Sequence, residues 1–258
     1  MNLTVKDFIL LIPCYNDYDG LIQSVNSVHY PKSSHEILIV DDGSDVPLNQ
    51  EDIQNKYPET TIQLIRINTN KGVSEALNTG LKVLHARNDY KYIARLDCGD
   101  ICHADRFTKQ VAFLDEHKET GLLGTWCRFI KQSTGKYYLY KTKTRYNDIL
   151  KEMHFKCSFI HPTVMFRKEI LDEIGYYPNE FAYAEDYVYF WQILKKYKGE
   201  ILAEVLVYIE YSSNSISVKN YKKQLKSRMR IVIDFGDNLF LKFLGVCLIV
   251  VRYLIPRK

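Results

Sequence analysis

The chain has 258 residues, enough for one large domain with a substantial buried core. Hydrophobic residues account for 46% of it and charged residues for 26%, which are ordinary values for a globular protein. The net charge of +4 is too small by itself to indicate a nucleic-acid-binding protein. The six cysteines form no CxxC pair, which argues against a disulfide framework or a zinc site and favours buried thiols in a reducing cytoplasm.

Strand-like and helix-like segments alternate through the first hundred residues. Continuous apolar runs are typical of strands covered on both faces, and four of them lie at residues 8–13, 36–40, 61–67 and 92–96. Apolar residues at helical spacing predict helices that begin after Asn16 or Asp17 and after Gly72. This alternation indicates βαβ units, so we predict an α/β fold with an open, mostly parallel, twisted sheet flanked by helices.

Carboxylates stand where two of these strands end. Asp41 and Asp42 follow the second run, and Asp97 and Asp100 follow the fourth with Gly99 between them. The carboxyl ends of strands form the edge at which open α/β sheets bind ligands, and two carboxylates there can hold a hard divalent cation. An ordinary turn is the alternative interpretation, because Asp and Gly are common in turns. Neither a Gly-rich dinucleotide fingerprint nor a P-loop follows the first strand, which argues against a dinucleotide oxidoreductase and a P-loop kinase.

The second half of the chain is less regular. Its patterns predict a strand, a hairpin turn, a β-rich stretch and a closing strand, at residues 121–130, 133–136, 159–167 and 201–209. The segment 145–156 carries no clear pattern. Glu185 and Asp186 open a helix that we expect to end at Gly199. Because the helix dipole favours acids in a first turn, a helix start alone also accounts for this acid pair.

The composition changes after residue 210. Six basic residues and no acid occupy 219–230, and an apolar segment follows at 239–255. The uncharged centre of that segment, 243–251, has nine residues, whereas a membrane-spanning helix needs roughly 20.

We therefore divide the chain into a domain, 1–210, and a basic, amphipathic helical tail, 211–258. Lys242 and Arg252 can extend their charged ends to the headgroups, so we expect the tail to lie on an anionic leaflet. The alternative is a helix packed on the domain or on a partner subunit.

Six motifs in a fixed order resemble those of the inverting family 2 glycosyltransferases, which have a GT-A type fold. They span about residues 7–210 and read LIPCYND, ILIVDDGS, NKGVSEALNTGL, YIARLDCGDICHADRFTKQVAFL, HPTVMFRKEIL and AEDYVYFWQIL. The resemblance implies a GT-A type sheet and the transfer of a sugar, with inversion, from a nucleotide-diphosphate sugar donor to a hydroxyl of a glycan acceptor. We expect the donor to be a UDP-sugar.

The resemblance also implies which residues act. Asp186 matches the acid expected to be the general base, with Glu185 beside it. Seven residues match donor-binding positions of the family. Pro13, Tyr15 and Asp41 match positions around the nucleoside, and Lys71 and Gly72 match the loop near the diphosphate. Asn78 lies on the helix after that loop, and Asp97 matches the first acid of the metal-binding DxD motif.

The DxD motif departs from the family pattern. Many relatives read DADD where this chain reads Asp97, Cys98, Gly99 and Asp100, so glycine replaces the second acid. We expect Asp97 and Asp100 to hold a divalent cation, Mn²⁺ or Mg²⁺, because two carboxylates offer the oxygen ligands that these ions prefer. Weak metal binding is the alternative.

The QxxRW motif of processive relatives does not follow Asp186, where the chain reads FWQILKK. We therefore expect one sugar to be added per acceptor. With the tail, the resemblance implies a peripheral enzyme on the cytoplasmic face of the inner membrane. Its acceptor would be a lipid-linked or lipid-anchored glycan of lipopolysaccharide, O-antigen or capsule biosynthesis. The sequence leaves open whether the protein is a homo-oligomer.

Three other interpretations compete with this one. A sugar nucleotidyltransferase also has an open α/β sheet, but it calls for a Gly-rich, Arg-containing loop where this chain reads PCYNDYDG. A catalytically silent nucleotide-sugar-binding subunit of a membrane-bound glycan assembly complex is suggested by Gly99. A nucleic-acid binder would combine the basic cluster with Tyr211 and Tyr221 as stacking groups. The acids at the strand ends argue against it, so we expect no nucleic-acid partner.

Overall fold

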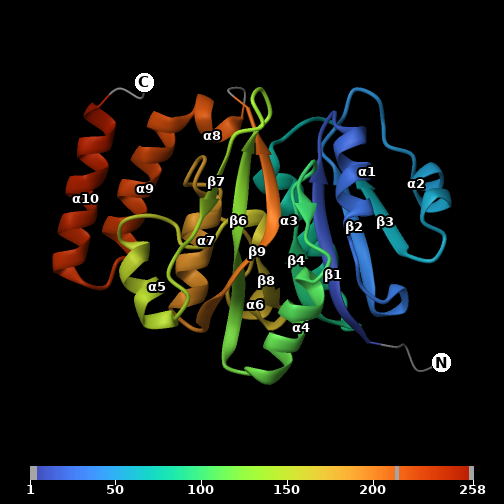
Figure 1. Cartoon of the computed structure of the whole chain (residues 1–258), viewed down its shortest axis with the longest axis horizontal. Helices are drawn as coiled ribbons and strands as arrows, with labels where there is room; N and C mark the ends of the chain where they lie inside the picture. Colours follow the sequence, from blue (N-terminus) through green and yellow to red (C-terminus); the bar gives the residue numbers. More distant parts are fainter. Residues whose placement is uncertain (1–4, 213–214, 256–258) are drawn as a thin grey trace.

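A computed structural model of the chain describes residues 5–212 and 215–255. Residues 1–4 of the predicted domain, and 213–214 and 256–258 of the predicted tail, lie outside the described residues. In the described part, helices cover both faces of one twisted sheet, which confirms the predicted α/β fold of the GT-A type (Figure 1).

The first half of the sheet is parallel, as the alternation predicts. Its strands lie in the order β3-β2-β1-β4 and comprise β1 Lys6–Cys14, β2 His35–Asp41, β3 Thr61–Arg66 and β4 Tyr90–Arg95. Along β1, alternate side chains enter two separate cores: Ile9 and Leu11 enter one, and Leu10 and Ile12 enter the other. Burial on both faces is the reason that these strands read as continuous apolar runs.

Beyond β4 the sheet becomes mixed. The short β8 (Met165–Arg167) runs antiparallel to β4 and to β6 (Thr120–Lys131), and β6 lies parallel to β9 (Lys198–Tyr211). Beside β9, β5 (Ile101–Cys102) pairs antiparallel.

Two predictions for this half differ in outcome. The hairpin is confirmed, since β7 (Tyr137–Tyr140) pairs antiparallel with β6. The β-rich stretch 159–167 is confirmed in part, because β8 ends it but the 3-10 turn η2 (His161–Thr163) occupies its centre. Pro162, which has no N–H to donate to a ladder, lies within that turn.

Helices pack on the two faces separately. The core on one face contains side chains of α1 (Tyr18–Asn26), α2 (Gln50–Lys56) and α4 (Arg106–Glu116). The core on the other face contains those of α3 (Val73–His85), α5 (Tyr146–Met153), α6 (Glu169–Glu173) and α7 (Glu185–Leu194). A short 3-10 turn, η1 (Lys32–Ser34), leads into β2.

Helix boundaries follow local chemistry. Asp17 is the N-cap of α1, and its Oδ1 accepts a hydrogen bond from the backbone N–H of Gly20 (3.0 Å). The helix that starts at Glu185 ends at Leu194, and the prediction that it continues to Gly199 is wrong. Gly199 already pairs with β6, so the chain has become strand there.

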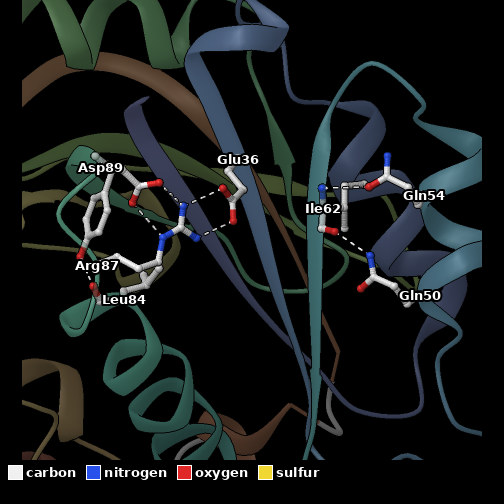
Figure 2. Close-up of polar contacts among 8 residues, drawn as sticks. Glu36, Gln50, Gln54, Ile62, Leu84, Arg87 and Asp89 are labelled. Atoms are coloured by element: carbon white, nitrogen blue, oxygen red, sulfur yellow. Dashed lines mark hydrogen bonds and ion pairs between the residues drawn. The ribbon is translucent and has the colours of Figure 1, made fainter. Parts of the chain in front are cut away.

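A buried charge network connects β2 with the segment before β4. Arg87 donates from Nη1 and Nη2 to the two carboxylate oxygens of Glu36, at 2.6 and 2.8 Å, and from Nε to Asp89, at 2.9 Å (Figure 2). On the other side of the same view, two glutamines of α2 bond the main chain of Ile62 in β3 (Figure 2). These bonds tie β2 to the segment before β4, and α2 to β3.

The tail forms three helices, α8 (Ile216–Lys219), α9 (Tyr221–Phe235) and α10 (Leu239–Leu254). Figure 1 shows α9 beside α7 and α10 as the outermost helix, at the end of the molecule opposite β3. Leu225, Ile231 and Val232 of α9 belong to the same core as α7. None of the described helices is both long enough and apolar enough to cross a bilayer.

Candidate active site

The ends of β1 and β2 lie side by side at the edge of the sheet. Cys14 is in register with Asp41, and the N–H of Asp42 donates to the carbonyl of Cys14 (2.8 Å). Pro13 is buried within β1, whereas Tyr15 projects from the loop after it and is 46% exposed. The parallel register therefore brings together the residues that the resemblance assigns to the nucleoside.

Asp41 is fully buried and organises its own loop. Its carboxylate accepts hydrogen bonds from the backbone N–H groups of Ser44 (2.9 Å) and Leu48 (3.3 Å) and pairs with Arg66 Nη1 (2.5 Å). Burial raises the pKa of Asp41, but these hydrogen bonds outweigh it and hold that pKa below the usual value. Recognition of a base by Asp41 stays a prediction, and in this structure the carboxylate holds the loop.

Asp42 has a positioning role that the sequence did not reveal. Its two carboxylate oxygens accept the backbone N–H groups of Lys71 (2.9 Å) and Gly72 (2.8 Å). Gly72 has φ +89°, a left-handed conformation that favours glycine, and it is the N-cap of α3. Asp42 thus fixes the predicted diphosphate loop to the end of β2.

Asn78 acts as a clamp between α3 and the loop that precedes α7. Its Nδ2 donates to the carbonyl of Tyr177 (2.9 Å), and its Oδ1 accepts the N–H of the same residue (2.9 Å). The Tyr177 hydroxyl lies 2.9 Å from Nε2 of His161. Both amide atoms of Asn78 are therefore engaged within the protein, and a direct contact to the donor stays a prediction.

Asp97 is the accessible acid after β4. Its side chain is 40% exposed, and one carboxylate oxygen lies 2.7 Å from Nη2 of Arg95, which is completely buried in the strand. Arg95 also donates from Nη1 to the carbonyl of Leu11. A cation inside an otherwise apolar strand was a signal in the sequence that pattern reading passed over.

Asp100 differs from Asp97 in its surroundings. It is only 5% exposed, and burial, followed by the charge of Asp97, raises its pKa well above the usual value. Ser24 of α1 holds this loop by donating to the Asp100 carbonyl (2.8 Å) and accepting the N–H of Gly99 (3.0 Å). Of the two predicted metal ligands, Asp97 is thus the one that faces solvent.

The described residues contain no group of three or more His, Cys, Asp or Glu side chains that could hold a metal ion. Asp97 by itself fits a different kind of site, in which one or two carboxylates share a hard cation with the phosphates of a bound substrate. The exposed carboxylate satisfies that requirement, and the buried Asp100 does not without a change in its position.

Glu185 and Asp186 occupy the first turn of α7. Asp186 accepts the N–H of Tyr187 on Oδ1 (2.7 Å). Burial raises the pKa of Asp186, while burial and the Asp186 charge raise the pKa of Glu185 to about 7. The negative charge of Asp97 also raises the pKa values of both acids, so the predicted metal-binding acid and the predicted base lie near enough to interact electrostatically.

This geometry suits a displacement at a phosphate-bearing carbon. An exposed carboxylate stands at a sheet edge, Lys71 lies on a loop fixed by Asp42, and a partly buried acid pair with raised pKa values can accept a proton. Comparison of the sequence with models of protein families identifies the family: the model of glycosyl transferase family 2 matches residues 9–175. The chain belongs to this family.

Related proteins align with a larger part of the chain than the segment matched by the family model. A glycosyltransferase of Haemophilus influenzae is 30% identical over 207 residues, covering 78% of this chain and 73% of its own length. A UDP-Gal:alpha-D-GlcNAc-diphosphoundecaprenol beta-1,3-galactosyltransferase of Escherichia coli is 25% identical, covering 78% and 71%. The structure of residues 1–349 of TarS from S. aureus in complex with UDP-GlcNAc superposes with a TM-score of 0.68 at 18% identity, covering 96% of this chain and 72% of that TarS chain. That likeness supports the GT-A fold.

Proposed function

We propose that this glycosyltransferase transfers a single sugar from a UDP-sugar to a hydroxyl of a lipid-linked glycan, with inversion, in the biosynthesis of a surface polysaccharide such as lipopolysaccharide, O-antigen or capsule. The observation that carries the proposal is the convergence of Asp97, Glu185 and Asp186 on one site. In the proposal, Asp97 supports the departure of the diphosphate and Asp186 serves as base.

In the proposed reaction, Asp186 accepts the proton of the acceptor hydroxyl while that oxygen bonds to the anomeric carbon. The bond from this carbon to the diphosphate oxygen breaks, and its electron pair leaves with UDP. Because attack and departure occur on opposite faces of the carbon, one displacement inverts its configuration. Positioned proton transfer of this kind contributes roughly 10²- to 10⁴-fold to a rate.

The leaving diphosphate needs compensating positive charge. Lys71, on the loop fixed by Asp42, can supply part of it, and Asp97 would hold a Mn²⁺ or Mg²⁺ ion together with the phosphates. Such an ion, when bound, neutralises charge that develops on the diphosphate. Asp100 stays a predicted second ligand.

The relatives support the choice of substrates. The E. coli relative is named for UDP-Gal and a diphosphoundecaprenol-linked acceptor, and the TarS structure holds UDP-GlcNAc. We extend to this chain the donor class, a UDP-sugar, and the acceptor class, a glycan on a lipid diphosphate.

A lipid-linked acceptor fits a protein that meets the membrane surface, and we propose α10 as the contact. Apolar side chains recur every three to four residues along this helix and face outward, and the exposed ones are Leu239, Phe240, Phe243, Leu244, Val250, Val251 and Leu254. The lysines of neighbouring α9 complement an anionic cytoplasmic leaflet: Lys222, Lys223 and Lys226.

A donor screen tests the proposal directly. The purified protein would be incubated with UDP-, GDP- and TDP-sugars, with and without Mn²⁺ or Mg²⁺, while slow donor hydrolysis and thermal stabilisation are recorded. We expect a UDP-sugar to be hydrolysed and the metal to increase the rate. Absence of any response to every donor would reject the proposed function.

A catalytically silent donor-binding subunit is the second candidate, favoured by Gly99 and the buried Asp100. It predicts that a UDP-sugar stabilises the protein and that no transfer occurs even with a diphosphoundecaprenol-linked acceptor. Transfer to such an acceptor would exclude it.

A further inference from the structure

The tail helix α9 contacts the segment that leads into the acid pair. Gln224 donates from Nε2 to the carbonyl of Tyr183 (2.9 Å), and Ser227 donates from Oγ to the carbonyl of Ala182 (2.9 Å). Tyr183 has φ +63°, an uncommon backbone conformation for a residue other than glycine. Two hydrogen bonds from α9 therefore hold the turn from which Glu185 and Asp186 project.

Arg228 follows these two residues on α9 and carries a positive charge into the same region. Its Nε is buried, and no hydrogen-bond partner for that atom exists in the part of the chain that the structure describes. Within that same part, no carboxylate lies close enough to form an ion pair with its guanidinium. Among residues 5–212 and 215–255, the Nε of this partly buried cation has no hydrogen-bond partner, an arrangement that costs free energy unless the charge has another use.

The charge of Arg228 acts on Asp186, where it lowers the pKa against the effect of burial. The ionisable side chains around Asp186 oppose its ionisation or are neutral at pH 7, whereas the backbone N–H of Tyr187 favours it by donating to Oδ1 (2.7 Å). These side chains come from α7, from the end of β4, from the segment after α5 and from the loop before α7, and they are Glu185, Tyr187, Asp97, Cys157 and Tyr177. Two of these five are acids, and the positive charge of Arg228 offsets their effect on Asp186 together with the Tyr187 N–H.

We propose that Arg228 is a positioning residue whose guanidinium stabilises the carboxylate form of Asp186, and that α9 is consequently part of the active site. This inference rests on the proposed function, because it assigns a purpose to the charge of a base. It also gives a role to a residue outside the segment matched by the family model, which ends at residue 175.

The test compares the pH dependence of kcat for hydrolysis of the UDP-sugar that the wild type turns over fastest, chosen among UDP-glucose, UDP-galactose and UDP-GlcNAc. The variants are Arg228→Gln, Arg228→Met, which keeps an unbranched stem, and Arg228→Lys, which keeps the charge. The control is Arg230→Gln, which removes a positive charge from the same helix at an exposed position paired with Asp234.

For the two neutral variants we expect the acid limb of the profile to move up by about one pH unit, so that kcat falls roughly tenfold below the limb and recovers at high pH. Arg228→Lys should keep most of the wild-type profile, and Arg230→Gln should leave it unchanged. Thermal unfolding would verify that each variant is folded, and the two neutral side chains give two chances to retain the fold.

An unmoved acid limb in a folded neutral variant would overturn the inference. So would a raised KM at an unchanged limb, because that pattern indicates a contact to the diphosphate instead. A wild type without turnover on any donor rejects the proposed function itself, which separates that failure from failure of the role of Arg228.

Discussion

At the scale of single residues, Asp186 is placed by two independent requirements. An acid in the first turn of α7 is favoured by the helix dipole, and a base must stand beside the reacting hydroxyl. Helix α7 satisfies the first requirement with either Glu185 or Asp186. Both acids are half-buried, and this burial raises their pKa values, which a helix start alone does not require.

We predict that Asp186→Asn nearly abolishes transfer, by roughly 10²- to 10⁴-fold, because the amide cannot accept the acceptor's proton. Donor binding should be retained, since Asp186 makes no proposed contact to UDP. Transfer rates and thermal stabilisation by UDP-sugar would measure the two effects. Glu180→Gln, which neutralises an exposed acid in the preceding loop, is the matched control, and near-normal turnover of Asp186→Asn would remove Asp186 from its role.

At the scale of elements, ion pairs and apolar faces decide how neighbouring elements hold together and what they present outward. Arg87 connects β2 with the segment before β4 through Glu36 and Asp89 (Figure 2). The Glu36 side chain is only 7% exposed, so its carboxylate depends on this partner. These ion pairs connect strands of the parallel half-sheet that carries the predicted donor-binding loops.

Arg87→Met should destabilise the protein by about 3–5 kcal/mol, because it leaves a buried carboxylate unpaired. Urea unfolding at pH 7 would measure this, and Lys91→Met, which removes a largely exposed ion pair with Asp7, should cost less than about 1 kcal/mol. Equal losses of unfolding free energy in the two variants would contradict the conclusion that the Glu36 carboxylate depends on Arg87.

The same network predicts a pH dependence of stability. Hydrogen bonds from Arg87 lower the pKa of Asp89 below 3.8 in the folded protein, and burial opposes this only in part. The stabilisation is therefore present above pH 3.8 and is lost as pH falls through the folded value. In Arg87→Met this acid-dependent loss should shrink.

The exposed apolar face of α10 leads us to predict that the protein binds anionic membranes through this helix. Phe240 and Phe243 are 68% and 66% exposed, and the double variant Phe240→Glu/Phe243→Glu should lose most binding to phosphatidylglycerol-containing vesicles in a sedimentation assay. Val46→Glu, at a position 80% exposed and far from α10 in sequence, should bind like the wild type. Unchanged binding of the double variant, with a shift from dimer to monomer, would instead make this face an interface between copies.

At the scale of the whole molecule, α9 shares its core with the rest of the protein. Leu225, Ile231 and Val232 are buried in the core that also contains the side chains of α3, α5 and α7. Gly245 lets α10 approach, since a Cβ at this position would lie 2.1 Å from the carbonyl oxygen of His154. The division at residue 210 stays a prediction about function, while packing continues across it.

Truncation after residue 210 should therefore destabilise the remaining chain, because each buried aliphatic side chain of α9 contributes roughly 1.5–3 kcal/mol. Truncation after residue 238, which removes α10 with its two buried residues, should cost much less. Thermal unfolding of both proteins would compare them. Equal stability of the shorter fragment and the full chain would show that α9 is an independent appendage.

The sequence by itself determined the alternation of strands and helices, the parallel half of the sheet, the hairpin and the family. These properties follow from local periodicity and from short motifs, which neighbouring residues specify. It also placed Asp97 and Asp186 at a strand end and a helix start. The short α2, α5 and α6 were not predicted, because too few apolar turns reveal a period.

Only the tertiary structure decided which polar groups are engaged and which are free. Asp41 and Asp97 read alike in the sequence, yet one is enclosed by its loop and the other reaches solvent. The clamp from Asp42 to Lys71 and the hydrogen bond from Ser227 to Ala182 join residues about thirty and forty-five positions apart. Such contacts depend on how whole elements pack, and no local pattern encodes the distance between two side chains carried by different elements.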